Sequence, residues 1–217
     1  MNRLLGCVLC MLPWMESIAQ MPREKLYDGR EYVIIPSLIS GTPFYKDAED
    51  ARSNAVCFDK VLYTEIPLLY DIRADELLAT RPGELTNMVV VKEFVTFFTI
   101  GSDTIVHLNE DTTGLASGFY LQIFDSPHFK SVARYRKAVK DPRAVNEKRY
   151  YFQTVDYYLK TPASEHFVPL RNTRTLLSIN KHHRKTLRKL LQTEGNREDF
   201  RVNIALVLNY LNKTEAL

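Results

Sequence analysis

Two clusters of cationic side chains are the residues of this sequence best suited to chemistry, and that chemistry is the binding of anions. The first cluster comprises Lys130, Arg134, Arg136, Lys137, Lys140, Arg143, Lys148 and Arg149, with Tyr135, Tyr150 and Tyr151 interleaved. The second comprises Lys181, His182, His183, Arg184, Lys185, Arg188 and Lys189. Clustered cations attract anionic groups, and salt weakens the attraction. We predict an anion-binding surface formed by Lys130, Arg134, Arg136, Lys137, Arg184, Lys185 and Arg188.

The distribution of charge leaves a second interpretation open. Residues 20–110 hold nine Lys and Arg against fifteen Asp and Glu, a net charge of −6. Residues 111–217 hold nineteen against ten, a net charge of +9. Such asymmetry is typical of a second half that binds an anionic partner. It is equally expected if the cations form a solvated face that balances the acidic half of the same fold.

Signals of catalysis or metal binding are weak. The five histidines do not form an H-E-x-x-H motif, and no cysteine pair has zinc spacing. The segment Gly114–Gly118 is similar to a nucleophile elbow, but Ser117 stands one position late. The carboxylates Asp71, Asp75 and Glu76 are close enough to pair, although acidic residues after a strand are usually solvated. We therefore expect no metal and no cofactor.

The first nineteen residues have the pattern of a signal peptide. Arg3 is the positive residue, Leu4 to Met15 form an apolar run, and Ser17 and Ala19 place small residues before a cleavage site. The run of about 12 residues is shorter than the roughly 20 that cross a bilayer, and we expect no transmembrane span in the mature form. We predict an exported protein, periplasmic or associated with the cell envelope. A retained anchor and lipid attachment at Cys7 are the alternatives.

Cleavage after Ala19 would leave Cys57 as the sole cysteine, so we expect no internal disulfide. Cys57 lies in a strand-like segment, which favours an inert buried thiol. A catalytic thiol would need a base beside it.

A hairpin is predicted at the centre of the chain. Phe119, Leu121 and Ile123 recur at period two, and residues 125–128 have turn chemistry. The return strand, residues 129–140, places Lys130, Arg134 and Arg136 on one face, which we expect to meet water.

The remaining pattern predicts an α+β fold. Residues 20–172 form a mostly antiparallel β-sheet body of about ten strands, barrel- or sandwich-like. Residues 173–217 form two helices packed on that body as a single folded unit, with Thr173 as the first N-cap and a break near Asn180. Within the body we expect a helical turn at residues 73–79, a loop at 109–114 and a pair of strands at 149–153 and 155–160.

The order of several short signatures resembles an uncharacterised family of exported bacterial proteins. The signatures are Gly41–Phe44, Leu68–Asp71, Gly118–Tyr120, the cationic return strand ending near Lys137, Tyr157–Tyr158 and the basic leucine helix at 176–191. The resemblance implies export and this fold type, and it implies no activity.

These observations together favour a non-catalytic envelope protein that binds or scaffolds through its basic second half. The expected partners are anionic lipid headgroups, glycans or another envelope protein. Export argues against nucleic acid, although cations interleaved with aromatic residues would suit RNA. The alternative function is that of a hydrolase acting on an envelope substrate.

Overall fold

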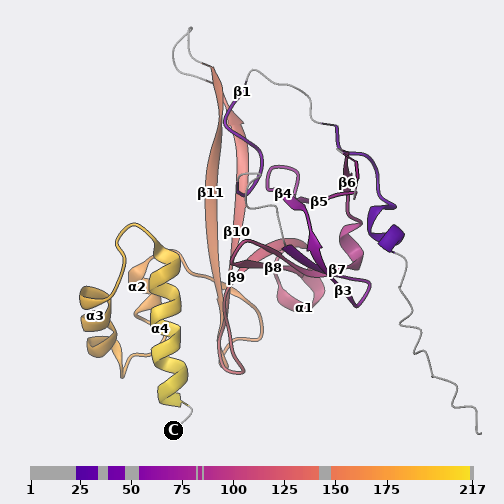
Figure 1. Cartoon of the computed structure of the whole chain (residues 1–217). Helices are drawn as coiled ribbons and strands as arrows, with labels where there is room; N and C mark the ends of the chain where they lie inside the picture. Colours follow the sequence, from indigo (N-terminus) through magenta and orange to yellow (C-terminus); the bar gives the residue numbers. More distant parts are fainter. Residues whose placement is uncertain are drawn as a thin grey trace, which may run out of the picture.

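The structure, a computed structural model, describes residues 23–33, 39–46, 54–81, 83–84, 86–141 and 148–215. The predicted signal peptide, residues 1–19, lies outside the described residues, and so does Arg143. Within the described part, twelve strands precede the main helices. Figure 1 shows how these strands and helices are arranged. This order confirms a β-rich α+β protein.

Nine of these strands form one large sheet. They are β1 (Ile39–Ser40), β2 (Asn54–Phe58), β3 (Val61–Ile66), β7 (Val95–Ile100), β8 (Asp103–Leu108), β9 (Gly118–Asp125), β10 (Lys130–Lys140), β11 (Arg149–Lys160) and β12 (Val168–Pro169). The order across the sheet is β1-β11-β10-β9-β8-β7-β2-β3, and β12 pairs with β11 beside this path. Neighbours are antiparallel except β1, which runs parallel to β11. The sheet is therefore mixed and open, and the described strands form no closed barrel.

A smaller antiparallel sheet packs on one face of the large sheet. It contains β4 (Leu68–Asp71), β5 (Glu76–Thr80) and β6 (Asn87–Val89). Tyr70 of β4 meets Phe98 of β7 and Phe119 of β9, with ring centroids 5.5 and 5.6 Å apart. Phe98 and Phe119 are 5.0 Å apart, and all three ring pairs are edge-on. This arrangement suits the charge distribution of aromatic rings, so the three rings hold the two sheets together.

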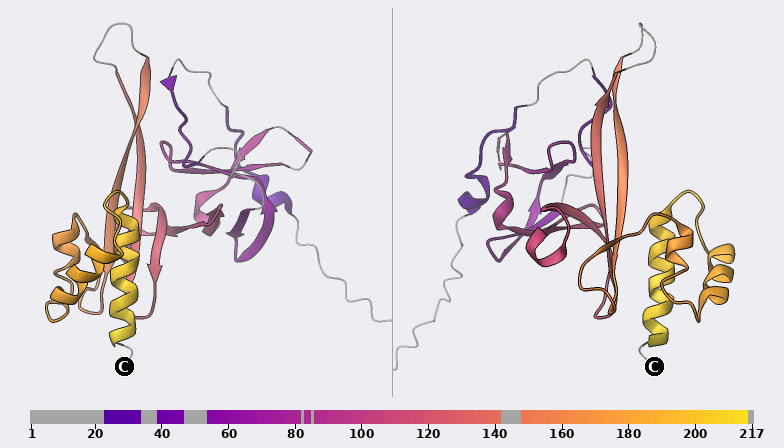
Figure 2. Two further views of the ribbon diagram at one scale, coloured as in Figure 1. Left: turned by 60° about the vertical axis from the view of Figure 1, so that its left-hand side comes forward. Right: turned by 180° about the vertical axis from the view of Figure 1, so that it is seen from behind.

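The helices pack beside the lower half of the long hairpin β10–β11 (Figures 1 and 2). They are α2 (Thr173–Leu176), α3 (Arg184–Thr193) and α4 (Phe200–Glu215), while α1 (Glu110–Thr113) is a separate short turn. Short 3-10 turns occupy Arg23–Tyr27 and Lys92–Phe94. A second hydrophobic cluster joins Phe129, Leu159 and Leu170 to the inner faces of the helices. The α3 and α4 positions that were expected to be apolar, such as Leu187 and Leu208, are buried in it.

The central hairpin is confirmed. β9 and β10 lie at the predicted positions, and the Ser126 hydroxyl accepts a hydrogen bond from the Phe129 amide in the turn. β11 is one strand rather than two, because its register with β10 is unbroken from Lys160 to Tyr150. Figure 1 shows the hairpin β10–β11 rising beyond the helices, with β1 beside it.

Three smaller predictions are wrong. Residues 73–79 form no helical turn, because the Asp71 carboxylate accepts hydrogen bonds from the Arg73 and Ala74 amides and the chain then enters β5. Residues 109–114 contain α1 rather than a loop alone. The N-cap of the first helix is Asn172, whose side chain accepts a hydrogen bond from the Thr175 amide. The break near Asn180 is real, since the chain leaves helix between α2 and α3.

The turn between β2 and β3 offers a test of backbone strain. Asp59 and Lys60 have φ angles of 49° and 65°, the left-handed values of a type I′ turn, which favours glycine at the second position. We expect Lys60→Gly to raise the free energy of unfolding by about 0.5–1 kcal/mol, because relief of left-handed strain exceeds the entropy cost of glycine. Urea denaturation measures the change. Lys60→Ala keeps the Cβ atom and is the control; an equal gain from it would contradict the strain argument.

Candidate anion-binding face

The predicted cations of β10 contact acceptors inside the protein. Lys130 lies 2.9 Å from the Asp125 carboxylate, and Arg136 pairs with Asp156. Lys137 donates a hydrogen bond to the Thr42 carbonyl at 2.9 Å. Lys130 and Arg136 still expose about half of their side chains, at 54% and 50%. Their charges are therefore matched locally even though water reaches them.

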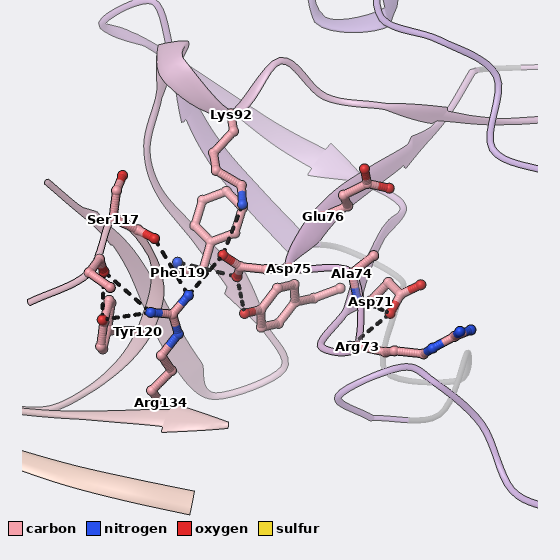
Figure 3. A network of polar contacts seen from close by, with 12 residues as sticks. Asp71, Arg73, Ala74, Asp75, Glu76, Lys92, Ser117, Phe119, Tyr120 and Arg134 are labelled. Carbon is pink, nitrogen blue, oxygen red and sulfur yellow. Dashed lines mark hydrogen bonds and ion pairs between the residues drawn. The ribbon is translucent and has the colours of Figure 1, made fainter. Parts of the chain in front are cut away.

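Arg134 departs from the predicted cationic face, because only 14% of its side chain is exposed. Its guanidinium lies 3.5 Å from the Asp75 carboxylate and donates to the carbonyls of Ala116 and Ser117 and to the Tyr120 hydroxyl (Figure 3). The segment before β9 covers it. The expectation that Arg134 faces water is wrong. The strand periodicity predicts on which face of β10 the side chain lies, but it does not predict that another segment covers that face.

Asp75 is the centre of this polar network (Figure 3). One carboxylate oxygen accepts hydrogen bonds from the Tyr70 hydroxyl at 2.7 Å and the Phe119 amide at 3.3 Å. The other accepts from the Lys92 ammonium at 2.9 Å and faces Arg134. Burial, followed by the charge of Asp75, raises the pKa of Tyr70 well above its usual value, so the hydroxyl remains a donor. Since both oxygens are engaged, we interpret the network as a clamp between the two sheets.

The other predicted carboxylates do not pair with Asp75. Asp71 caps the turn that follows β4 and also accepts a hydrogen bond from the Tyr32 hydroxyl at 2.6 Å. Glu76 receives two hydrogen bonds of 2.7 Å from Arg30. Each acidic group thus has its own donor, and the three do not form the close carboxylate pair that general acid–base chemistry uses.

A second polar network joins the helices to the large sheet. The Asp103 carboxylate on β8 lies 2.8 Å from Lys46 and accepts hydrogen bonds from Tyr45 at 3.0 Å and from Arg201 of α4 at 3.1 Å. Burial alone would raise the pKa of Asp103, but the hydrogen bonds from Lys46 and Tyr45 and the charges of Lys46 and Arg201 hold it below its usual value. The ionised form therefore stabilises the fold.

The helical cations are arranged differently from those of β10. The sequence from residue 166 to residue 193 contains seven Lys and Arg and no Asp or Glu. All seven are exposed, and none of them forms an ion pair with the part of the chain that the structure describes. We call this set the helical basic face; its members are Arg171, Arg174, Lys181, Arg184, Lys185, Arg188 and Lys189.

The geometry of α3 explains why these charges are displayed. At 100° per residue, Arg184, Lys185, Arg188 and Lys189 fall on one side of the helix, and Leu187, Leu190 and Leu191 on the other. Leu187 is fully buried, which turns the cationic side toward solvent. Arg171 and Arg174 were absent from the predicted cluster. The acid-free run of sequence is the signal that identifies them.

A groove of about 350 Å³ lies next to this face, between α2, α3 and α4. The exposed Arg188 and Arg197 line it together with the more buried Leu177, Leu191 and Phe200. The turn that carries Arg197 is fixed by the Asn203 side chain, whose oxygen accepts a hydrogen bond from the Asn196 amide at 2.8 Å. Two guanidinium groups beside one groove suit a phosphate or carboxylate group.

The histidine and cysteine side chains of the described residues form no further candidate site. No three His, Cys, Asp or Glu side chains in them are placed to hold a metal ion. His183 packs against Tyr210 and His107 against Phe119, and burial lowers the pKa of His107. Cys57 is half-buried on β2. None of the described helices combines the length and apolar character needed to cross a membrane.

The Asp75 network leads to a test at Gly118, where φ is 154°. A Cβ atom there would lie 2.5 Å from the nearest Asp75 oxygen and 2.7 Å from Arg134. We expect Gly118→Ala to lower the free energy of unfolding by about 2–3 kcal/mol, because it strains the backbone and separates the partly buried Asp75 and Arg134. Gly83→Ala is the matched control, since Gly83 has φ of 81° and open space around it, and should cost about 1 kcal/mol in a urea titration. Equal losses would show that the network contributes nothing.

The Asp103 network leads to a pH-dependent test. A carboxyl group whose pKa is lowered on folding stabilises the protein fully above its unfolded pKa, near 3.9, and loses that effect as pH falls through the folded pKa. We expect Asp103→Asn to be less stable than the wild type at pH 7, and the gap to narrow below about pH 4. Urea unfolding between pH 7 and pH 3 measures the gap. Asp141→Asn, at a carboxylate 82% exposed, should follow the wild type throughout; a constant gap for Asp103→Asn would contradict the interpretation.

Comparison of the chain with known protein families, with curated protein sequences and with solved structures gave no match. The resemblance to a family of exported bacterial proteins therefore stays a prediction.

Proposed function

We propose that this protein is exported and binds anionic groups of the cell envelope, without catalysis, through the helical basic face. The proposal rests on one contrast. The predicted cations of β10, Lys130, Arg134, Arg136 and Lys137, are matched by internal acceptors, whereas the seven cations of the helical basic face are exposed and have no internal ion pair in the described residues. An anionic partner would therefore pair with the helical basic face and not with the cations of β10.

The alternative explanation, that the basic half merely balances the acidic half, applies to part of the molecule. Arg134 pairs with Asp75 and Arg201 with Asp103, so cations of the second half do meet carboxylates of the first. Such pairing supports the alternative for the sheet. It does not extend to α3, whose neighbouring acidic residues, Glu194 and Glu198, are exposed at the far end of the helix and form no ion pair with it.

The expected partner is a surface that carries many phosphate or carboxylate groups, such as anionic lipid headgroups or acidic glycans. Each Lys or Arg near an anionic lipid surface contributes about 1 kcal/mol, so several exposed cations together suffice for reversible adsorption. Because the cations are solvated before binding, the attraction should weaken steeply with salt.

Adsorption to lipid vesicles tests the proposal. We expect the full chain to bind vesicles of phosphatidylglycerol and phosphatidylcholine at low salt, and to bind phosphatidylcholine vesicles far less. The triple variant Arg184→Gln, Lys185→Gln, Arg188→Gln should weaken adsorption by about 100-fold, at about 1 kcal/mol for each lost charge. Cosedimentation at several salt concentrations measures the effect.

The matched control removes three cations that have internal carboxylate partners. Lys130→Gln, Arg136→Gln and Arg149→Gln lose the same charge from side chains that are 54%, 50% and 57% exposed. This control should bind within a few-fold of the wild type. Equal weakening by the two triple variants, or no adsorption at low salt, would contradict the proposal.

A further inference from the structure

A hollow of about 310 Å³ opens on the face of the large sheet that looks away from the small sheet. Its apolar lining comes from Val106 and Leu108 of β8, Phe124 of β9, Val132 of β10 and Phe167. Side chains alternate across a strand, so Val106 and Val132 face this hollow while their neighbours Ile105 and Ala133 enter the core beneath the small sheet. We call this hollow the outer pocket.

The outer pocket is preformed but its apolar wall remains in contact with water. Phe167 is held across its edge by a hydrogen bond from its amide to the Thr113 carbonyl. Val132 is buried, whereas Val106, Leu108, Phe124 and Phe167 are each partly exposed. A cluster of partly exposed apolar side chains around one hollow is the usual lining of a small-molecule site.

Three charged residues lie in one row beside this apolar wall. The strand registers place Asp125 opposite Lys130, and Lys130 opposite Lys160, and all three line the pocket. The Asp125 carboxylate is 2.9 Å from Lys130. Lys160 is half-buried, and its ammonium group forms no hydrogen bond or ion pair with the described residues. Like charges directly opposite each other on neighbouring strands are destabilising. Asp125 balances only one of the two lysines, so a second negative charge beside Lys130 and Lys160 would be stabilised.

We propose that the outer pocket binds a medium-chain fatty acid or a similar amphiphile with one carboxylate. The acyl chain lies against the apolar wall, and the carboxylate lies between Lys130 and Lys160, where it supplies this second negative charge. The volume is at the lower end of the range of about 300–1,000 Å³ for ligand pockets, which favours a medium chain over a long one. This site is separate from the helical basic face and from the function proposed for that face.

Calorimetry of decanoate binding to the full-length protein tests the proposal. The decanoate concentration is kept below the value at which micelles form. We expect saturable binding with one site per chain, and about fourfold tighter binding for each methylene group from octanoate to decanoate. Decanol has the same chain without the charge and should bind at least tenfold more weakly than decanoate.

Two variants assign the site. Lys160→Gln should weaken decanoate binding about tenfold or more and leave decanol binding unchanged, because the charge-assisted contact is lost and the apolar wall is kept. Leu108→Trp places a larger ring in the hollow and should remove the binding of both probes. Far-ultraviolet circular dichroism verifies that each variant is folded. An unfolded Leu108→Trp is replaced by Val106→Phe, for which the same loss is expected.

The triple variant Arg184→Gln, Lys185→Gln, Arg188→Gln should bind decanoate as the wild type does, so failure of the vesicle experiment leaves this test intact. Loss of decanoate binding in that variant would move the site to the helical basic face and overturn the proposal. Absence of saturable binding, or indifference of decanoate binding to Lys160→Gln, would also overturn it. So would concentration-dependent dimerisation that Leu108→Trp abolishes in the absence of decanoate, since a second copy would then occupy the hollow.

Discussion

The fold depends on holding one carboxylate, that of Asp75, among donors from both sheets. Four groups meet its two oxygens, and they come from β4, β9, β10 and the 3-10 turn before β7. Removing one partner from this partly buried ionic network leaves an unpaired charge with reduced access to water, which costs more than the intact pair contributes. The network therefore fixes the position of the small sheet on the large one, and the packed rings of Tyr70, Phe98 and Phe119 supply the apolar area beside it.

This constraint separates two kinds of cation that are indistinguishable in sequence. Arg134 and Arg188 both stand in runs of basic residues with apolar neighbours. Arg134 is enclosed because the chain before β9 crosses over it, and its guanidinium binds acceptors within the protein. Arg188 is displayed because Leu187 and Leu191 turn the opposite side of α3 inward. Position relative to the covering segments, rather than local composition, determines which cations are available to a partner.

Local signals were sufficient for much of the fold. The alternation in β9 and β10 and the change to helical spacing after residue 172 are direct consequences of side-chain periodicity, and both predictions are confirmed. Residues 73–79 were misjudged because the Asp71 cap uses a side chain rather than a periodic pattern. The clamp at Asp75 was beyond sequence reasoning, since Lys92 and Arg134 lie 17 and 59 positions away and meet it only after the sheets pack. The exposed set on the helices was partly predicted, and Arg171 and Arg174 were missed because they precede the periodic segment.

The long strand pair β10–β11 lines two hydrophobic clusters, the core beneath the small sheet and the cluster under the helices, and Tyr157 contacts each of them. Ile123 of β9 and Tyr157 of β11 pack against both clusters, so dissociation of either the helices or the small sheet would expose part of their apolar surface. Neither layer can therefore melt without uncovering apolar area that the remaining layer does not protect. The three layers should accordingly behave as a single thermodynamic unit, in which a ligand or surface that stabilises the helices also stabilises the sheet core built on the same strands.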